Sequence, residues 1–191
     1  SYQNDEIAIY ELQAFPNQWK KIKVLVSNVR CVDTTFFTYE EKDYMFTFKQ
    51  ERGGVRGELY LYRIEEGNIS LAQTISKDVS SARPGGNILW KDGKAIRVSQ
   101  NGDGGYGSGL VFSVIDTVEP VYEEHEVKRI SAEDVQGNWK RTFTGIHTYN
   151  QIDDIEVIDL KNQKISFTEY LARKRVRKVF QNKYGDRLGK D

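Results

Sequence analysis

The sequence predicts an all-β protein, and three observations favour that fold class. Aromatic residues make up 12% of the 191 residues, and aromatic side chains are enriched in β-strands. Apolar and polar residues alternate over many short segments bounded by turn residues, as in strands joined by hairpins. Similar segments recur about every fifty residues, a spacing typical of β-propeller blades. These observations predict a partial β-propeller of about three blades, each a four-stranded antiparallel sheet, followed by a C-terminal α-helix.

The alternation predicts twelve strands within a propeller region that spans residues 1–165. In chain order, the predicted strands are 6–13, 20–27, 32–39, 43–50, 57–65, 69–76, 86–91, 94–100, 108–116, 122–130, 145–150 and 154–160. One domain is expected, because a chain of this length is marginal for two.

Internal similarity indicates how these strands group. The segments IAIYELQ, GELYLYRIE and SGLVFSVID resemble one another, and their aromatic residues Tyr10, Tyr62 and Phe112 lie 52 and 50 residues apart. The longer segments CVDTTFFTYEEKDYMFTFKQ, SARPGGNILWKDGKAIRVSQ and FTGIHTYNQIDDIEVIDLK each contain a polar turn, an apolar strand, a charged turn and a second strand. The expected order is two outer strands, two complete blades and two inner strands. A β-sandwich is the alternative, but a sandwich does not require this similarity.

The segment 166–191 has a different pattern. Ser166 and Glu169 have the spacing of a capping box at a helix start. They open a segment with apolar residues at roughly helical spacing, namely Phe167, Tyr170, Leu171, Val176 and Phe180. This segment is predicted to form the C-terminal helix and tail.

Charge and cysteine content limit the partners and the compartment. Lys and Arg together number 28, equal to Asp and Glu, so the net charge predicts no nucleic-acid partner. The single cysteine, Cys31, cannot form an internal disulfide, which is compatible with a cytoplasmic protein. No apolar run is long enough to predict a membrane span.

Two short motifs invite ligand assignments that their surroundings do not favour. The segment NGDGGYGSG is rich in glycine, but a strand follows it where a dinucleotide-binding loop requires a helix. The same segment lacks the acidic residue at the twelfth position of a calcium loop, and one cysteine with two separated histidines gives no zinc spacing. The sequence therefore predicts no cofactor and contains no metal-binding motif, and the metal content stays open.

The combination of SSARPGGNILWKDGKAIRVSQNGDGGYGSGLVFSVI, EEHEVKRI and GIHTYNQIDDIEVIDL resembles the last blades of a five-bladed propeller domain. That domain is related to the family-43 and family-32 glycoside hydrolases. It is the N-terminal domain of glucosamine inositolphosphorylceramide transferases and also accompanies bacterial sugar formyltransferases. The resemblance covers roughly residues 6–161.

The resemblance also implies an incomplete propeller, because five blades need about 250 residues at this spacing. Either upstream blades belong with this chain, or the ring closes in another way. The N-terminal strand pair could complete the C-terminal pair within one chain or between two chains, and the second arrangement would be a homodimer.

The resemblance places three residues at the start of successive inner strands, where the hydrolase relatives carry acidic groups. Asp33 corresponds to an acid that orients the catalytic groups of the relatives and tunes their pKa values. Arg83 occupies the place of the general acid, and His147 lies in the next blade. Asp33 and His147 are the candidate catalytic residues. A guanidinium stays protonated and cannot deliver the proton that glycoside hydrolysis requires. Conventional hydrolysis by this chain alone is therefore not expected, and whether the chain is an enzyme stays open.

The forked donors of Arg83 suit a carboxylate or a phosphate. The other candidate binding residues could add hydrogen bonds or an aromatic face; they are Asn87, Arg97, Gln100, Tyr106 and Asn150, and Trp90 is a further candidate for stacking. The predicted ligand is a sugar, a sugar phosphate or a nucleotide sugar in surface-glycan metabolism. Two alternatives remain: Arg83 and Asp33 form a structural pair, or the domain docks a neighbouring glycosyl- or formyltransferase domain without catalysis.

Overall fold

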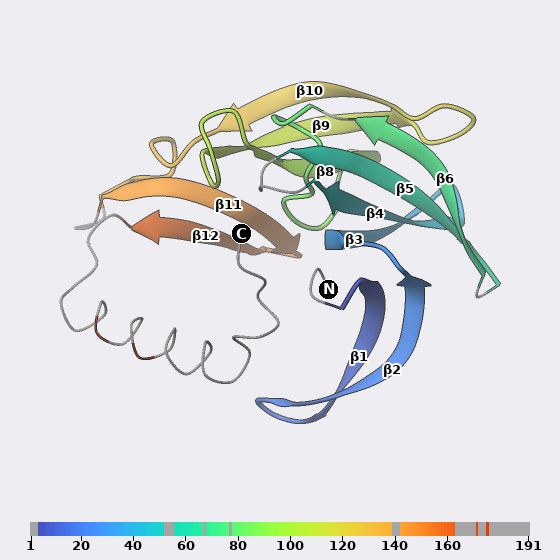
Figure 1. Cartoon of the computed structure of the whole chain (residues 1–191). Coiled ribbons are helices and arrows are strands. Elements are labelled where there is room, and N and C mark those ends of the chain that lie inside the picture. The colour runs from blue at the N-terminus through green and yellow to red at the C-terminus, as the bar shows by residue number, and fades with distance from the viewer. Residues whose placement is uncertain are drawn as a thin grey trace.

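The computed structural model describes residues 4–51, 56–66, 68–76, 78–138 and 142–162, together with Leu171 and Arg175. Its elements are twelve strands (Figure 1). The first six are β1 (Glu6–Ala14), β2 (Gln18–Ser27), β3 (Cys31–Tyr39), β4 (Lys42–Gln50), β5 (Gly57–Glu65) and β6 (Asn68–Ser76). The last six are β7 (Leu89–Lys91), β8 (Lys94–Asn101), β9 (Gly109–Thr117), β10 (Glu123–Ile130), β11 (Phe143–Ile152) and β12 (Ile155–Asn162).

The strands form four antiparallel sheets that follow one another along the chain. Strands β3 to β6 form one four-stranded sheet, and strands β7 to β10 form the other. A two-stranded sheet lies at each end of the series, β1–β2 before them and β11–β12 after them. The twelve predicted strands and their grouping into two, four, four and two are confirmed.

The predicted all-β class is confirmed, but the predicted propeller is wrong. The sheets form an open series, because among the described strands none pairs with the second edge of β1 or of β12 and no ring of blades closes. The described elements also include no helix. The segment predicted to form the C-terminal helix lies outside the described residues apart from Leu171 and Arg175. Repeated four-stranded units were visible in the sequence, but closure depends on contacts between distant units that periodicity does not report.

Tight turns hold the hairpins in register. Glu40 and Glu41 join β3 to β4 with φ values of 48° and 62°, and Asp92 and Gly93 join β7 to β8 with φ values of 50° and 73°. Positive φ at both central residues is the requirement of a type I′ turn, whose twist matches that of the flanking strands. The charged turns of the sequence pattern are therefore the hairpin connections.

Three apolar clusters join the four sheets. The largest lies between the two four-stranded sheets and includes Phe46, Leu61 and Tyr122. The second joins the β1–β2 hairpin to the β3–β6 sheet through Ile7, Met45 and Tyr62, and the third joins the β7–β10 sheet to β11–β12. Burial of apolar surface therefore holds each sheet to the next one. Both β3 and β11, each the first strand of its sheet, contact the segment before β7, because Thr35 donates to the carbonyl of Gly86 and the Tyr149 amide donates to the carbonyl of Gly85.

Candidate functional site

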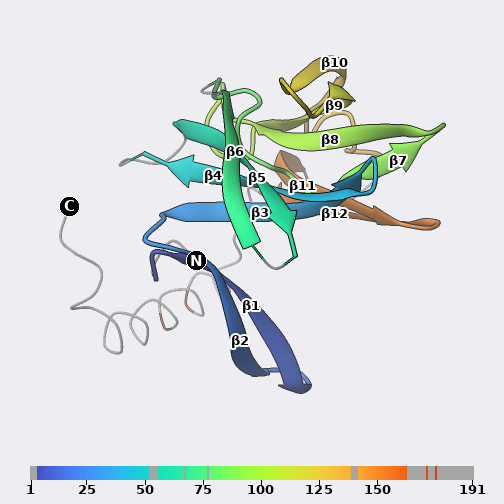
Figure 2. The same ribbon diagram turned by 90° about the vertical axis from the view of Figure 1, so that its right-hand side faces the viewer.

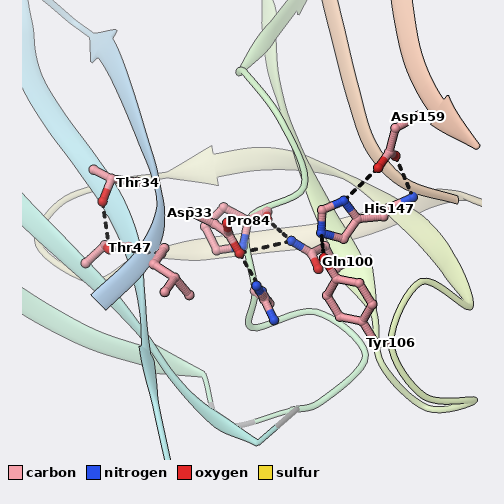
Figure 3. A network of polar contacts seen from close by, with 10 residues as sticks. Asp33, Thr34, Thr47, Pro84, Gln100, Tyr106, His147 and Asp159 are labelled. Atoms are coloured by element: carbon pink, nitrogen blue, oxygen red, sulfur yellow. Dashed lines mark hydrogen bonds and ion pairs between the residues drawn. The ribbon is translucent and has the colours of Figure 1, made fainter. Parts of the chain in front are cut away.

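The candidate site begins at a β-bulge in β3. The register of β3 with β4 shifts between Val32 and Thr35, and Asp33 in this bulge has a φ of 53°. Thr34 of the same bulge is fixed by a 2.9 Å hydrogen bond to the buried Thr47. A bulge redirects side chains, and non-glycine residues with positive φ are concentrated at functional sites. The bulge directs Asp33 toward the next sheet (Figure 3).

Arg83 and Gln100 meet Asp33 from that sheet. Arg83 donates from Nε to Oδ2 of Asp33 at 2.5 Å, and Gln100 donates from Nε2 to the same oxygen at 3.2 Å. Gln100 is held in place because it also donates to the carbonyl of Pro84 at 2.7 Å. The guanidinium carbon of Arg83 lies 5.7 Å from the ring centre of Phe48 and 5.4 Å from that of Tyr106. The predicted structural pair of Asp33 and Arg83 is therefore present.

Tyr106 continues the chain of contacts to His147 and Asp159. The Tyr106 hydroxyl is hydrogen-bonded to Nε2 of His147, and Nδ1 of His147 lies 2.9 Å from Oδ2 of Asp159 (Figure 3). The second carboxylate oxygen of Asp159 accepts hydrogen bonds from the backbone amides of His147 and Thr148. A neutral imidazole with its proton on Nδ1 satisfies both ring contacts.

A second bulge explains how β11 presents His147. The β11–β12 register shifts between Ile146 and Tyr149, at the same place in the strand as the bulge of β3. The backbone amide of Ile146 donates to the carbonyl of Gly107, which ties β11 to the loop that carries Tyr106. The two bulges therefore direct Asp33 and His147 toward one surface, with Arg83 and Tyr106 between them.

The pKa shifts at this surface follow from burial and neighbouring charge. Partial burial raises the pKa of Tyr106; the positive charge of Arg83 opposes this, and the negative charges of Asp33 and Asp159 add to it. Burial also disfavours ionisation of Asp159, but hydrogen bonds from Thr148 and His147 outweigh it and lower its pKa. The phenol therefore stays protonated at neutral pH, and Asp159 stays ionised.

A shallow hollow with a cavity volume of about 10 Å³, room for about one water molecule, lies beside these groups, and Arg83, Gln100 and Tyr106 contribute to its lining. Tyr106 is 55% exposed. The arrangement offers a ligand one guanidinium and one phenol, while both ring nitrogens of His147 are engaged by Tyr106 and Asp159. Asp33 and Asp159 both accept hydrogen bonds in the structure, so neither is arranged as a proton donor.

Asn87 and Asn150 lie next to this surface and hold it together. The Asn150 side chain accepts a hydrogen bond from the backbone amide of Asn87, and the Asn87 side chain exchanges two hydrogen bonds with the backbone of Gln151. Gly86 permits this close approach, because a Cβ atom there would lie 1.7 Å from the carbonyl oxygen of Tyr149. The contacts found for these two asparagines tie the turn before β7 to β11.

Arg97 and Trp90 are not brought to the same surface. Arg97 is 1% exposed and donates from two nitrogens to Glu124, which also accepts a hydrogen bond from Tyr122. The guanidinium carbon of Arg97 lies 5.7 Å from the ring centre of Phe46 in the core. Trp90 is stacked with Tyr39. The contacts of Arg97 are those of a buried structural ion pair.

Sequence reasoning missed Asp159 and Phe48. Asp159 lies between the apolar residues Ile158 and Leu160 of β12. A carboxylate at such a position in a strand indicates that a polar group lies next to it. Phe48, which supports Arg83, belongs to an ordinary apolar alternation and gives no signal. Among the described residues there is no group of three or more His, Cys, Asp or Glu side chains that could hold a metal ion. In the same part of the chain, no helix is long and apolar enough to cross a membrane.

Comparison with protein families gives one assignment. A family model described as "Glucosamine inositolphosphorylceramide transferase 1, N-terminal" matches residues 1–164. Comparison with curated proteins and with solved structures gives no match. The relation to glycoside hydrolases expected from the sequence is not confirmed by these comparisons.

Proposed function

Because the chain belongs to the family of the N-terminal domain of glucosamine inositolphosphorylceramide transferase 1, we propose that it is a glycan-recognition domain. It binds a sugar phosphate on the surface formed by Arg83, Tyr106 and His147. The name of the matched family includes the term inositolphosphoryl. An inositol phosphate combines a polyhydroxylated ring with an anion. A ligand of this class matches the donors present at the site.

The observation that carries this proposal is that only the Nε atom of the Arg83 guanidinium is paired within the described part of the protein. Its Nε atom binds Asp33, and no described residue accepts a hydrogen bond from its two Nη groups. Guanidinium groups bind phosphate oxygens in a bidentate manner, and such charge-assisted hydrogen bonds are among the stronger ones in proteins. The partly buried surroundings, with 17% of the Arg83 side chain exposed, strengthen an electrostatic contact relative to one in bulk water.

Tyr106 supplies a contact to a ring hydroxyl group, and His147 holds the Tyr106 side chain in place. The Tyr106 oxygen has a second lone pair that accepts a hydrogen bond while its proton faces His147. Asp159 fixes the imidazole through Nδ1, so the orientation of both rings is set before a ligand binds. Pre-organised groups lose less conformational entropy on binding.

The hydrogen bonds of the two carboxylates at the site support binding of a ligand without hydrolysis. Glycoside hydrolysis needs one carboxylic acid that protonates the leaving oxygen. Asp33 is paired with Arg83, and Asp159 accepts hydrogen bonds from His147 and Thr148. The proposal therefore predicts binding of the sugar phosphate with no cleavage of a glycosidic bond.

A second candidate function is the docking of a neighbouring transferase domain. The observation that favours it is the matched family, whose description names the N-terminal part of a transferase. In that case the same surface contacts protein, and small sugar phosphates do not bind.

Calorimetric titration with inositol monophosphate, free inositol and inorganic phosphate separates these functions. The proposal predicts that inositol monophosphate binds more tightly than either fragment, and that Arg83→Ala lowers its affinity about tenfold or more. Arg129→Ala, which removes an exposed arginine outside the site, serves as the matched control. Absence of binding by all three ligands would favour the docking function.

A further inference from the structure

The two sheets at the ends of the series are each half the size of the sheets between them. Strands β1–β2 form one, strands β11–β12 form the other, and both intervening sheets have four strands. The segment IAIYELQ of β1 resembles the third strands β5 and β9, and EVIDLK of β12 lies in the position of the second strands β4 and β8. The end sheets therefore supply complementary halves of one four-stranded sheet.

Burial differs between these strands and their counterparts in the complete sheets. The middle residues of β4, β5, β8 and β9 are mostly buried. By contrast, β12 exposes Ile155 and Val157, at 68% and 59%, and β1 exposes Ile9 and Leu12. The β1–β2 hairpin projects from the other sheets in both views (Figures 1 and 2). Its further exposed apolar residues are Tyr10, Phe15, Trp19, Ile22 and Val24.

The two hairpins differ in net charge. Strand β2 carries three lysines, Lys20, Lys21 and Lys23, and β1 carries two glutamates, Glu6 and Glu11, so the β1–β2 hairpin has a net charge of +1. The β11–β12 hairpin carries four acidic residues, Asp153, Asp154, Glu156 and Asp159, with one lysine. Opposite net charges favour association of the two hairpins with each other over association of either hairpin with its own copy.

We infer that two copies of this chain associate by pairing β12 of each copy with β1 of the other. The association forms two composite four-stranded sheets in the order β11-β12-β1-β2, and a two-fold axis relates them. Each strand pair supplies main-chain hydrogen bonds to an edge that no described strand occupies. A groove beside β12, lined by apolar residues that include Phe112, Ile130 and Ile158 and by four charged residues, receives side chains of the partner hairpin.

The complete sheet predicts the register of this pairing. Tyr39 pairs with Lys42 at the β3–β4 turn, and Ile152 pairs with Ile155 at the β11–β12 turn, so Ile158 corresponds to Met45. Met45 stands opposite Tyr62 in β4–β5, and Tyr62 corresponds to Tyr10. Ile158 of one copy then faces Tyr10 of the other, and Val157 faces Glu11.

The oligomeric state of the 191-residue chain tests the inference. Light scattering and sedimentation are expected to show a dimer of the 22.1 kDa chain that Leu12→Asp and Val157→Asp each convert to a monomer. Leu71→Asp, which places the same charge at an exposed position on β6, is expected to leave the dimer intact. Circular dichroism checks that the exposed substitutions leave the strands folded.

Oxidation of a double cysteine variant tests the register independently. A chain carrying both Glu11→Cys and Val157→Cys is expected to form an intermolecular disulfide, because residues opposite one another in an antiparallel pair lie within bridging distance. Leu71→Cys with Val157→Cys is the control and is expected to stay uncrosslinked. A wild-type monomer, a dimer that survives Leu12→Asp and Val157→Asp, or a disulfide within one chain would each overturn the inference.

Discussion

Arg83 and Asp33, which lie fifty residues apart in the sequence, form an ion pair between two successive sheets with an Nε to Oδ2 distance of 2.5 Å. Gln100 donates to the same carboxylate oxygen, so one acidic group balances one guanidinium at the centre of the proposed site. The net charge presented to a ligand therefore depends on Asp33 as much as on Arg83.

Asp33→Asn is expected to strengthen the binding of a sugar phosphate. Asparagine tolerates the positive φ of this position and still accepts a hydrogen bond from Arg83, but it removes the negative charge that competes with the phosphate. We expect the affinity for inositol monophosphate to rise several-fold in calorimetric titration, while any binding of free inositol stays unchanged. A fall in phosphate affinity would contradict this role of Asp33.

Asp159→Asn is expected to lower stability in a pH-dependent manner. The pKa of Asp159 is lowered in the folded protein because hydrogen bonds from Thr148 and His147 outweigh the effect of burial. A carboxylate with a lowered folded pKa stabilises the protein above its unfolded pKa, and this stabilisation is lost as the pH falls through the folded value. The free energy of unfolding by urea is expected to differ between wild type and variant at neutral pH. The difference disappears at acidic pH below the ordinary range of aspartate.

Asp154→Asn, at an exposed turn of the same hairpin, is the control for that measurement. It is expected to change the free energy of unfolding little at any pH. A constant difference between Asp159→Asn and wild type across the acidic range would contradict the proposed hydrogen bonding of the ionised carboxylate.

Arg97→Ala is expected to destabilise the fold strongly, since it leaves the Glu124 carboxylate without its cationic partner at the core. Removing one member of a buried ion pair costs about 3–5 kcal/mol of unfolding free energy. Arg129→Ala, which breaks an exposed pair with Glu126, is expected to cost less than about 1 kcal/mol. Urea unfolding measures both, and equal effects would show that Arg97 is not a structural residue.

Gly86→Ala is expected to separate the turn before β7 from β11, because the added Cβ atom meets the carbonyl oxygen of Tyr149. A loss of about 2 kcal/mol or more is expected from such overpacking. Gly93→Ala has no atom within 4 Å of the added Cβ and a φ of +73°, so it is expected to cost about 1 kcal/mol from backbone strain alone. Similar losses for the two variants would contradict the close approach.

The sequence predicted the strands and their grouping because local alternation and turn residues determine both. It also identified Asp33, Arg83, Gln100, Tyr106 and His147, which the structure brings to one surface. Arg97 was assigned to the same surface because its strand also carries Gln100, but side chains alternate between the faces of a strand. An odd separation between the two residues places Arg97 in the core.

Apart from the Asp33–Arg83 pair, the contacts between distant parts of the chain at this site were not predicted from the sequence. The partnership of Asp159 with His147 depends on the β11–β12 register and on a bulge in that register. The sequence predicted a partial propeller and left open how its ring would be completed, because completion depends on edges that no described strand occupies. Neither feature leaves a local pattern, whereas a hairpin turn does.

The most direct test of the account is a calorimetric titration of inositol monophosphate into the wild-type protein and into Arg83→Ala. Binding by the wild type that weakens about tenfold or more in the variant, with Arg129→Ala unchanged, is the predicted result. Equal binding by wild type and Arg83→Ala, or binding by neither, would contradict the assignment of this surface as a sugar phosphate site.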